Sequence, residues 1–169
     1  MYPTLNYLPI DFDIYSAIDT TMAYSGKYRP VNSSKYRGDP TNIVYRSLWE
    51  RRVMVEFDTN PHVLEWGSEE VIVPYRSPLD GRYHRYFPDF VVKMREKSGA
   101  IKTKMIEVKP LSQTVAPPPH DGKRKPTKKY ITEVARYGIN SAKWKAAQEY
   151  CKDRGWEFVI ITERELGIK

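Results

Sequence analysis

The chain has 169 residues, enough for one compact domain, and its single cysteine excludes an intramolecular disulfide and a cysteine-rich zinc site. It has no apolar run of about 18 residues that could span a membrane and no secretory signal, so we expect a protein of a reducing cytoplasm. The formal net charge is +7; because the first 21 residues carry −3, the rest carries +10, which favours a polyanionic partner such as nucleic acid.

Residues 1–45 differ in composition from the rest, and we predict an N-terminal extension and arm there, followed by a single domain over residues 46–169. The first part of the extension is acidic and lacks periodicity. Residues 23–45 mix Gly, Pro, Ser, Tyr and basic residues, which is typical of an extended segment. Two interpretations stay open for this arm: a tail packed along the domain surface, or a basic arm that contacts DNA phosphates through Lys35 and Arg37.

The first regular element is a helix that begins in "SLWERR". Ser47 is a typical N-cap, Glu50 lies three residues later as in a capping box, and Asn60-Pro61 ends the helix. The segments "VLEW" and "SEEVIVPYR" are predicted to be extended because they contain β-branched residues, and Asp80-Gly81 favours a hairpin turn.

Two strands are expected to follow. "RYHRYFPDFVVKM" is predicted to be one long strand, kinked at Pro88, and "IKTKMIEVKP" is the next. Because the linker "REKSGA" between them is short, the two strands should be antiparallel neighbours.

A proline-rich stretch, residues 111–127, is predicted to be an irregular loop, and a loop of this length is usually functional or disordered. It runs into "KRKPTKK", in which five of seven residues are basic. A solvated mobile loop is one interpretation; a DNA contact is the other, and the overall charge favours it slightly. The candidate DNA-binding residues here are Lys123, Arg124, Lys125, Lys128 and Lys129.

The C-terminal part predicts two helices and a strand. "KKYITEVARYGIN" and "SAKWKAAQEYCKDRG" each show helical periodicity, with Ser141 as the N-cap of the second and Gly155 after its end. "WEFVIIT" follows as a buried strand. The order of helix, three or four strands, two helices and a strand predicts an α/β (α+β) domain, in which helices flank a central mixed sheet.

Charged residues interrupt both strands of the predicted hairpin. Glu107 and Lys109 lie on one face of their strand because side chains alternate with a period of two. If the hairpin folds symmetrically about Ser98, Asp89 lies opposite Glu107. Two carboxylates so close together favour a shared proton or a bound cation.

This arrangement predicts metal-assisted hydrolysis of a phosphodiester. Oxygen ligands select Mg²⁺, with Mn²⁺ as a substitute, and we expect Asp89 and Glu107 to hold the ion, with the Val108 carbonyl as a further candidate ligand. Lys109 would orient or activate the attacking water and stabilise the developing charge. Taken alone, however, so short a pattern favours an exposed surface salt bridge.

The context of these residues changes that balance. "PDF" opening an apolar stretch, "IEVKP" after a hairpin and an acidic helix upstream resemble the PD-(D/E)xK nuclease superfamily, whose restriction-endonuclease-like core has the order αβββαβ. The resemblance implies that Glu50 supplies a further catalytic carboxylate that binds water or a second metal ion. Its role in a capping box is the alternative, and Glu56 and Glu65 are weaker candidates for the same place.

A second resemblance covers nearly all of residues 22–168 and includes segments that the chemistry alone does not require. It is to the head completion nucleases of T-even-type tailed bacteriophages, and it rests on "MAYSGKY", "SKYRGDP", "YRSLWE", "EWGSE", "VIVPY", "RYFPDF", "IEVKP" and "NSAKWKAAQ".

The second resemblance implies a DNA endonuclease, with possible exonuclease action, in the cytoplasm of an infected bacterium. It would act on double-stranded DNA at assembling phage heads, meet portal or head–tail connector proteins, and serve head–tail joining after packaging. Its oligomeric state and its retention in the virion are left open. Two alternatives remain: a structural adaptor that binds DNA and portal without cutting, and a junction-resolvase-like recombination nuclease.

Overall fold

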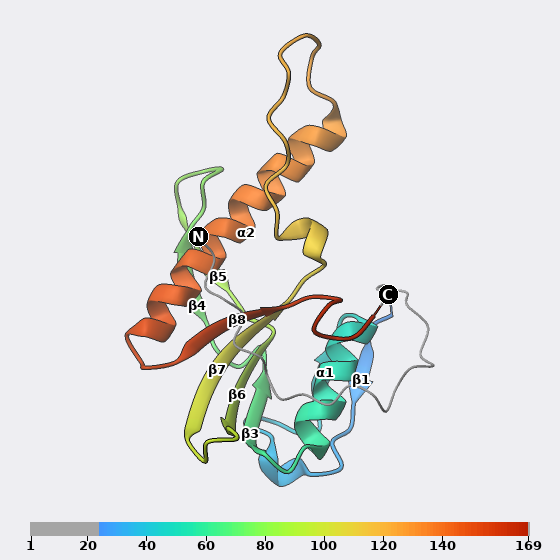
Figure 1. The fold of residues 1–169 in the computed structure, drawn as a ribbon, viewed down its shortest axis with the longest axis vertical. Coiled ribbons are helices and arrows are strands. Elements are labelled where there is room, and N and C mark those ends of the chain that lie inside the picture. The colour runs from blue at the N-terminus through green and yellow to red at the C-terminus, as the bar shows by residue number, and fades with distance from the viewer. Residues whose placement is uncertain (1–23, 169) are drawn as a thin grey trace.

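The centre of the fold is a four-stranded sheet flanked by two helices, and we describe it over residues 24–168 of a computed structural model (Figure 1). The strand order is β3-β6-β7-β8; β8 runs parallel to β7, and the other pairs are antiparallel. The elements of this core, in chain order, are α1 (Leu48–Thr59), β3 (Val63–Ser68), β6 (Phe90–Arg95), β7 (Ile101–Val108), α2 (Lys128–Lys152) and β8 (Glu157–Ile161). The order αβββαβ confirms the predicted class.

Four shorter strands and two 3-10 helices surround this core. β1 pairs with β2, and β4 pairs with β5, each as a separate two-stranded antiparallel sheet. Within residues 24–168, no helix is long and apolar enough to cross a membrane. The bounds of these elements are β1 (Gly26–Tyr28), η2 (Ser33–Lys35), β2 (Ile43–Tyr45), β4 (Val73–Arg76), β5 (Tyr83–Tyr86) and η3 (Leu111–Gln113).

The start of α1 is as predicted. The hydroxyl of Ser47 accepts a hydrogen bond from the Glu50 amide, which satisfies one of the free N–H groups of the first turn. The helix ends at Thr59, directly before Asn60-Pro61. Its buried face includes Val53 and Phe57.

The long strand predicted around Pro88 is wrong in one respect, because it forms two strands in different sheets. β5 ends at Tyr86 and pairs with β4 across the Asp80-Gly81 turn, whereas β6 begins at Phe90 and pairs with β3 and β7. Proline cannot donate a ladder hydrogen bond, so pairing stops at Pro88 and the chain changes direction there. Asp89 therefore lies directly before the first residue of β6.

The two predicted C-terminal helices are a single helix, α2. Gly138 and Ser141 lie inside it, and the N-cap is Thr127, whose hydroxyl accepts a hydrogen bond from the Tyr130 amide. A glycine inside a helix costs only about 1 kcal/mol, which packing readily offsets. Figure 1 shows the C-terminal half of α2 beside the sheet, while its N-terminal half projects from the body together with the preceding loop.

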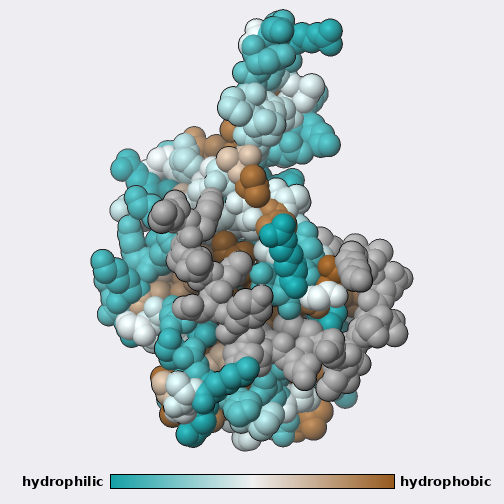
Figure 2. Space-filling model, in the orientation of Figure 1, coloured by the Kyte–Doolittle hydropathy of each residue, from teal (hydrophilic) through white to brown (hydrophobic). Residues whose placement is uncertain are grey.

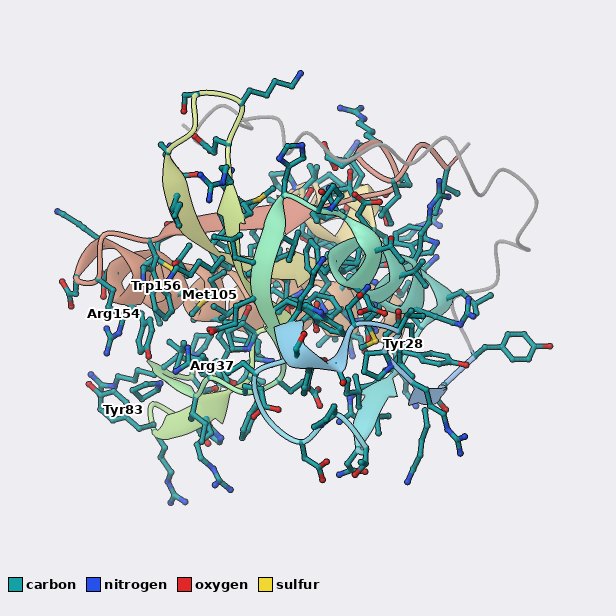
Figure 3. The ribbon with its side chains drawn as sticks, turned by 90° about the horizontal axis from the view of Figure 1, so that it is seen from below. Tyr28, Arg37, Tyr83, Met105, Arg154 and Trp156 are labelled. Carbon is teal, nitrogen blue, oxygen red and sulfur yellow. The ribbon has the colours of Figure 1, made fainter. Side chains whose placement is uncertain are left out.

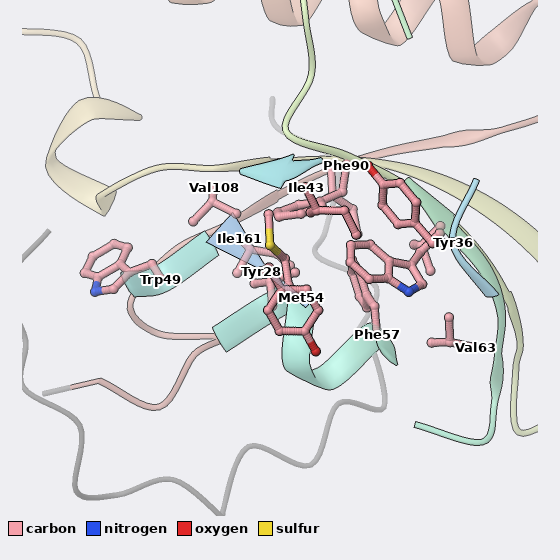
Figure 4. Close-up of a cluster of buried hydrophobic side chains, with 14 of the residues drawn as sticks. Tyr28, Tyr36, Ile43, Trp49, Met54, Phe57, Val63, Phe90, Val108 and Ile161 are labelled. Atoms are coloured by element: carbon pink, nitrogen blue, oxygen red, sulfur yellow. The ribbon is translucent and has the colours of Figure 1, made fainter. Parts of the chain in front are cut away.

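The sheet has an apolar cluster on each face. On the α1 side, Phe57, Trp66, Phe90 and Ile106 pack together, and Figure 4 shows part of this cluster. On the α2 side the cluster contains Met105. Figure 3 shows Met105 beside α2 and Tyr28, which belongs to the α1-side cluster, next to α1. Because residues alternate along β7, Glu107 shares the α2-side face of Met105.

The predicted arm is held against the domain. Tyr28, Tyr36 and Ile43 are buried in the α1-side cluster. The buried carboxylate of Asp58 on α1 accepts hydrogen bonds from the Tyr28 hydroxyl (2.9 Å) and from the amides of Val31 (2.6 Å) and Asn32 (2.9 Å). Residues 24–45 are therefore packed along the domain surface, which is one of the two interpretations of the arm. Residues 1–21 lie outside the described range.

Candidate active site

The hairpin of β6 and β7 has the predicted register. Phe90 lies opposite Ile106, and continuing the pairing by one residue places Asp89 opposite Glu107. Glu107 is only 4 % exposed, and Asp89 is partly buried. The burial of Glu107 rules out the interpretation of this cluster as a solvent-face salt bridge.

Both carboxylate oxygens of Glu107 have partners. The Tyr86 hydroxyl donates a 2.6 Å hydrogen bond to Oε2, and the Lys109 ammonium lies 3.0 Å from Oε1. Burial and the neighbouring Glu107 carboxylate raise the pKa of Tyr86, so its hydroxyl remains a donor. β5 thus supplies a positioning contact, and the sequence pattern carried no signal for it.

The Asp89 carboxyl is strongly perturbed by its surroundings. Burial, and next the charge of Glu107, hold the pKa of Asp89 well above its usual range, against the opposing effects of Lys109 and of a hydrogen bond from the Val108 amide. That amide donates to Oδ2 at 2.7 Å. Because the N–H and C=O of one strand residue point to the same side, the Val108 carbonyl also faces the β6 side of β7.

Lys109 keeps its proton in this setting. Burial lowers its pKa, but the carboxylates of Glu107, Asp89 and Glu50 together outweigh burial, so the net effect is to raise the pKa. The side chain is 27 % exposed. Lys109 is therefore an ammonium at neutral pH, suited to orienting water or stabilising negative charge.

Glu50 has the capping role that the sequence predicts, and it also lies close to the other charged residues of the site. Its Oε2 accepts from the Arg46 amide at 2.8 Å, and its Oε1 accepts from the Ser47 hydroxyl at 3.0 Å, so it does help to cap α1. It also lies near enough to act on the pKa of Asp89 and Lys109. Burial raises the pKa of Glu50 itself.

The two other candidates for the third carboxylate have different partners. Glu56 accepts a hydrogen bond from the Asn60 amide side chain (2.8 Å) at the C-terminal end of α1. Glu65 on β3 pairs with Arg37 at 3.8 Å. Of the three, Glu50 is the one that the structure brings together with Asp89 and Lys109.

Sequence reasoning missed one charged pair beside the site. Nε and Nη2 of Arg46 donate to the two carboxylate oxygens of Glu69, each at 2.9 Å. Glu69 has φ of 55° and is the one non-glycine residue with positive φ in the described range. Its amide donates to the Asp89 carbonyl at 3.2 Å. No periodicity or spacing links Arg46 to Glu69, so this pair could not be predicted from the sequence.

The predicted DNA-binding residues lie in two places. Those between Lys123 and Lys129 are on the projecting loop and the start of α2, where Figure 2 shows a hydrophilic surface. In the arm, the Lys35 ammonium donates to the backbone carbonyls of Asp58 (3.0 Å) and Asn60 (2.8 Å), and Arg37 pairs with Glu65. The ammonium of Lys35 thus anchors the arm, and DNA contact by these residues stays a prediction.

The donor set fits a hard divalent cation. Among the described residues, no three His, Cys, Asp or Glu side chains are grouped as a metal cage. Mg²⁺ needs less, because it typically uses one or two carboxylates and completes its shell with water and substrate phosphate. Asp89 and Glu107, opposite one another at the end of the hairpin, meet this requirement.

Comparison with known proteins agrees with the geometry. The family described as TnsA-like endonuclease N terminal matches residues 60–163, a range that includes Asp89, Glu107 and Lys109 but not Glu50. The head completion nuclease of Enterobacteria phage T4 is 42 % identical over 152 residues, which cover 88 % of this chain and 99 % of that protein. No solved structure matches the chain.

Proposed function

The chain belongs to the family of TnsA-like endonuclease N-terminal domains and is a homologue of the T4 head completion nuclease, and from this premise we propose that it is a Mg²⁺-dependent DNA nuclease of phage head completion. The observation that carries the proposal is the buried pairing of Asp89 with Glu107, with Lys109 bonded to Glu107. A pair of carboxylates at such close range is costly unless a proton or a cation lies between them.

Asp89 and Glu107 would hold the ion, together with the Val108 carbonyl. Bound Mg²⁺ would supply an acidified water and neutralise charge on the phosphate. The Lys109 ammonium orients that water and stabilises the charge that develops on the phosphate as the P–O bond breaks. Tyr86 orients Glu107 through its 2.6 Å hydrogen bond. Groups that orient metal ligands affect the affinity for the metal ion, so Tyr86 should strengthen Mg²⁺ binding.

Glu50 is proposed to act as a further carboxylate close to Asp89 and Lys109. Burial favours its protonated form, while bonds from Arg46 and Ser47 fix its orientation. It would hold a water molecule or a second ion at the Asp89 edge. The hydrogen bonds to the start of α1 keep the carboxylate in place.

Substrate DNA would be held by its backbone. The projecting loop brings Lys123, Arg124 and Lys125 together, and the first turn of α2 adds Lys128 and Lys129. Contacts of this kind neutralise phosphates without reading sequence, so binding should weaken steeply with salt. The enzyme would act inside the infected bacterial host, where portal or head–tail connector proteins are the partners proposed for the same role.

A plasmid cleavage assay tests this proposal. Wild type, Asp89→Ala and Lys109→Ala are incubated with supercoiled DNA in Mg²⁺, Mn²⁺ or EDTA. We expect cleavage only by the wild type and only with a metal ion. Equal cleavage by all three proteins would refute the site assignment. A folded wild type that cuts no linear, circular or branched DNA would favour the non-cutting adaptor, and preference for branched DNA would favour a resolvase.

A further inference from the structure

Arg46 and Glu69 form a charged pair whose outer side is open. Two nitrogens of the Arg46 guanidinium donate to the two oxygens of Glu69, each at 2.9 Å. The Arg46 side chain is 65 % exposed, against 35 % for Glu69. A guanidinium has five N–H donors in a planar fork, so the remaining donors of Arg46 can contact a phosphate.

The backbones of both residues are tied to the proposed cutting site. The Arg46 amide donates to Oε2 of Glu50 at 2.8 Å, and the Glu69 amide donates to the Asp89 carbonyl at 3.2 Å. The pair therefore has a fixed position relative to two of the proposed catalytic carboxylates. It also joins the segment before α1 to the residue after β3, whose amide contacts Asp89.

The backbone conformation of Glu69 is unusual for a residue with a side chain. With φ of 55°, this position suits glycine, which adopts such a conformation without steric cost. A glutamate there accepts strain in order to place its carboxylate against Arg46. Partly exposed salt bridges add little to stability, so stability alone does not explain the pair.

The surroundings of Arg46 place it at the Glu50 end of the site. Its pKa is raised first by the hydrogen bond to Glu69 and its charge, and then by Glu50 and Asp89. The pKa of Lys109, by contrast, is raised first by Glu107 and then by Asp89. Both cations therefore act on Asp89 and Glu50, but they have different bonded partners, Glu69 for Arg46 and Glu107 for Lys109.

We propose that Arg46 binds the DNA backbone phosphate next to the one that is cut, and that Glu69 is a positioning residue that holds the guanidinium ready for it. This inference rests on the proposed nuclease function. The phosphate contacts the open side of the guanidinium, while Glu69 keeps the other side and prevents the long side chain from turning into solvent. The energetic benefit is that little side-chain freedom is lost when DNA binds.

The test compares Arg46→Ala, Arg46→Lys and Glu69→Gln with the matched control Arg95→Ala, an exposed arginine at the far end of β6. Binding of a labelled DNA duplex is measured in EDTA over a range of salt concentrations, and steady-state cleavage is measured in Mg²⁺. We expect Arg46→Ala to weaken binding about tenfold and to reduce the slope of log K against log salt by about one. KM should rise more than kcat falls.

Arg46→Lys should keep the salt slope but lose part of the affinity, because an ammonium cannot bind a phosphate bidentately. Glu69→Gln should weaken binding less than Arg46→Ala. If Glu69 acts through Arg46, the double variant Arg46→Ala/Glu69→Gln binds like Arg46→Ala alone. Arg95→Ala should match the wild type. Thermal unfolding checks that each variant is folded. If Arg46→Ala does not fold, the DNA binding of Arg46→Lys and Glu69→Gln tests the proposed phosphate contact.

The outcomes separate this inference from the function on which it rests. If the wild type cleaves DNA but Arg46→Ala or the conservative variants bind DNA with unchanged affinity and salt slope, the proposed role of Arg46 is wrong. The nuclease function is then unaffected. A wild type that binds but does not cleave overturns the nuclease, and the salt slopes still decide the phosphate contact. A wild type that neither binds nor cleaves overturns both.

Discussion

Replacing Asp89 with asparagine should stabilise the metal-free protein. The Asp89 carboxyl is buried and lies beside Glu107. Burial and the negative charge of Glu107 together hold the pKa of Asp89 well above its usual range. Asn has nearly the same shape, and its carbonyl oxygen can still accept the 2.7 Å hydrogen bond from the Val108 amide. The variant therefore removes an unfavourable charge without removing the contact.

The pH dependence follows from the direction of the shift. A carboxyl whose pKa is higher in the folded than in the unfolded state binds its proton more tightly when folded, so stability falls as pH rises from the unfolded to the folded pKa. Asp89→Asn should thus match the wild type at low pH, where both states are protonated, and exceed it at neutral pH. Replacing a buried ion pair by well-packed apolar residues is neutral or stabilises by up to about 4 kcal/mol, and we expect a gain within this range for Asp89→Asn. At this chain length each kcal/mol raises Tm by about 2–4 °C.

Thermal unfolding in EDTA across the range from pH 4 to pH 8 measures the effect. Asp153→Asn is the control, since it makes the same chemical change at an exposed position after α2. Added Mg²⁺ should raise the Tm of the wild type and leave that of Asp89→Asn nearly unchanged. If Asp89→Asn were less stable than the wild type at neutral pH in EDTA, the argument that Asp89 is a charge awaiting a cation would fail.

Three further predictions concern the surroundings of the site. Tyr86→Phe should keep the fold but lower metal affinity or activity by about 10–100-fold, which a Mg²⁺ titration of cleavage measures; an unchanged titration would contradict its positioning role. Asp58→Ala should cost about 3 kcal/mol or more, because three donors of residues 28–32 lose their acceptor; urea unfolding measures this loss, and an unchanged midpoint would show that the arm is held otherwise. Neutralising Lys123, Arg124 and Lys125 together should lower the salt slope of DNA binding by roughly two to three; an unchanged slope would remove the loop from the DNA interface.

The hairpin of β6 and β7 could be predicted because its determinants are local. A short linker fixes the antiparallel pairing, and alternation along β7 assigns the faces, so Asp89 and Glu107 were placed opposite one another correctly. The capping of α1 by Ser47 is equally local. The predicted division of α2 into two helices is wrong because Gly138 and Ser141 are typical of a helix boundary, yet a continuous helix tolerates both.

Contacts between distant elements could not be predicted in this way. Tyr86 reaches Glu107 only because the chain breaks at Pro88 and folds β5 into a separate hairpin. Arg46 and Glu69 lie 23 residues apart, before α1 and after β3, and their contact depends on how α1 packs against β3. These side chains gather around Asp89 through tertiary packing, which leaves no periodic trace in the sequence.

Metal binding and cleavage measured on the same preparations test the central claim most directly. Mn²⁺ binding is followed by calorimetry, and cleavage of a DNA duplex is followed under single-turnover conditions, for wild type, Glu107→Gln and Lys109→Met. The account predicts that Glu107→Gln loses both properties, whereas Lys109→Met still binds Mn²⁺ but cleaves about 100-fold more slowly or worse. Cleavage by Glu107→Gln at the wild-type rate would contradict it.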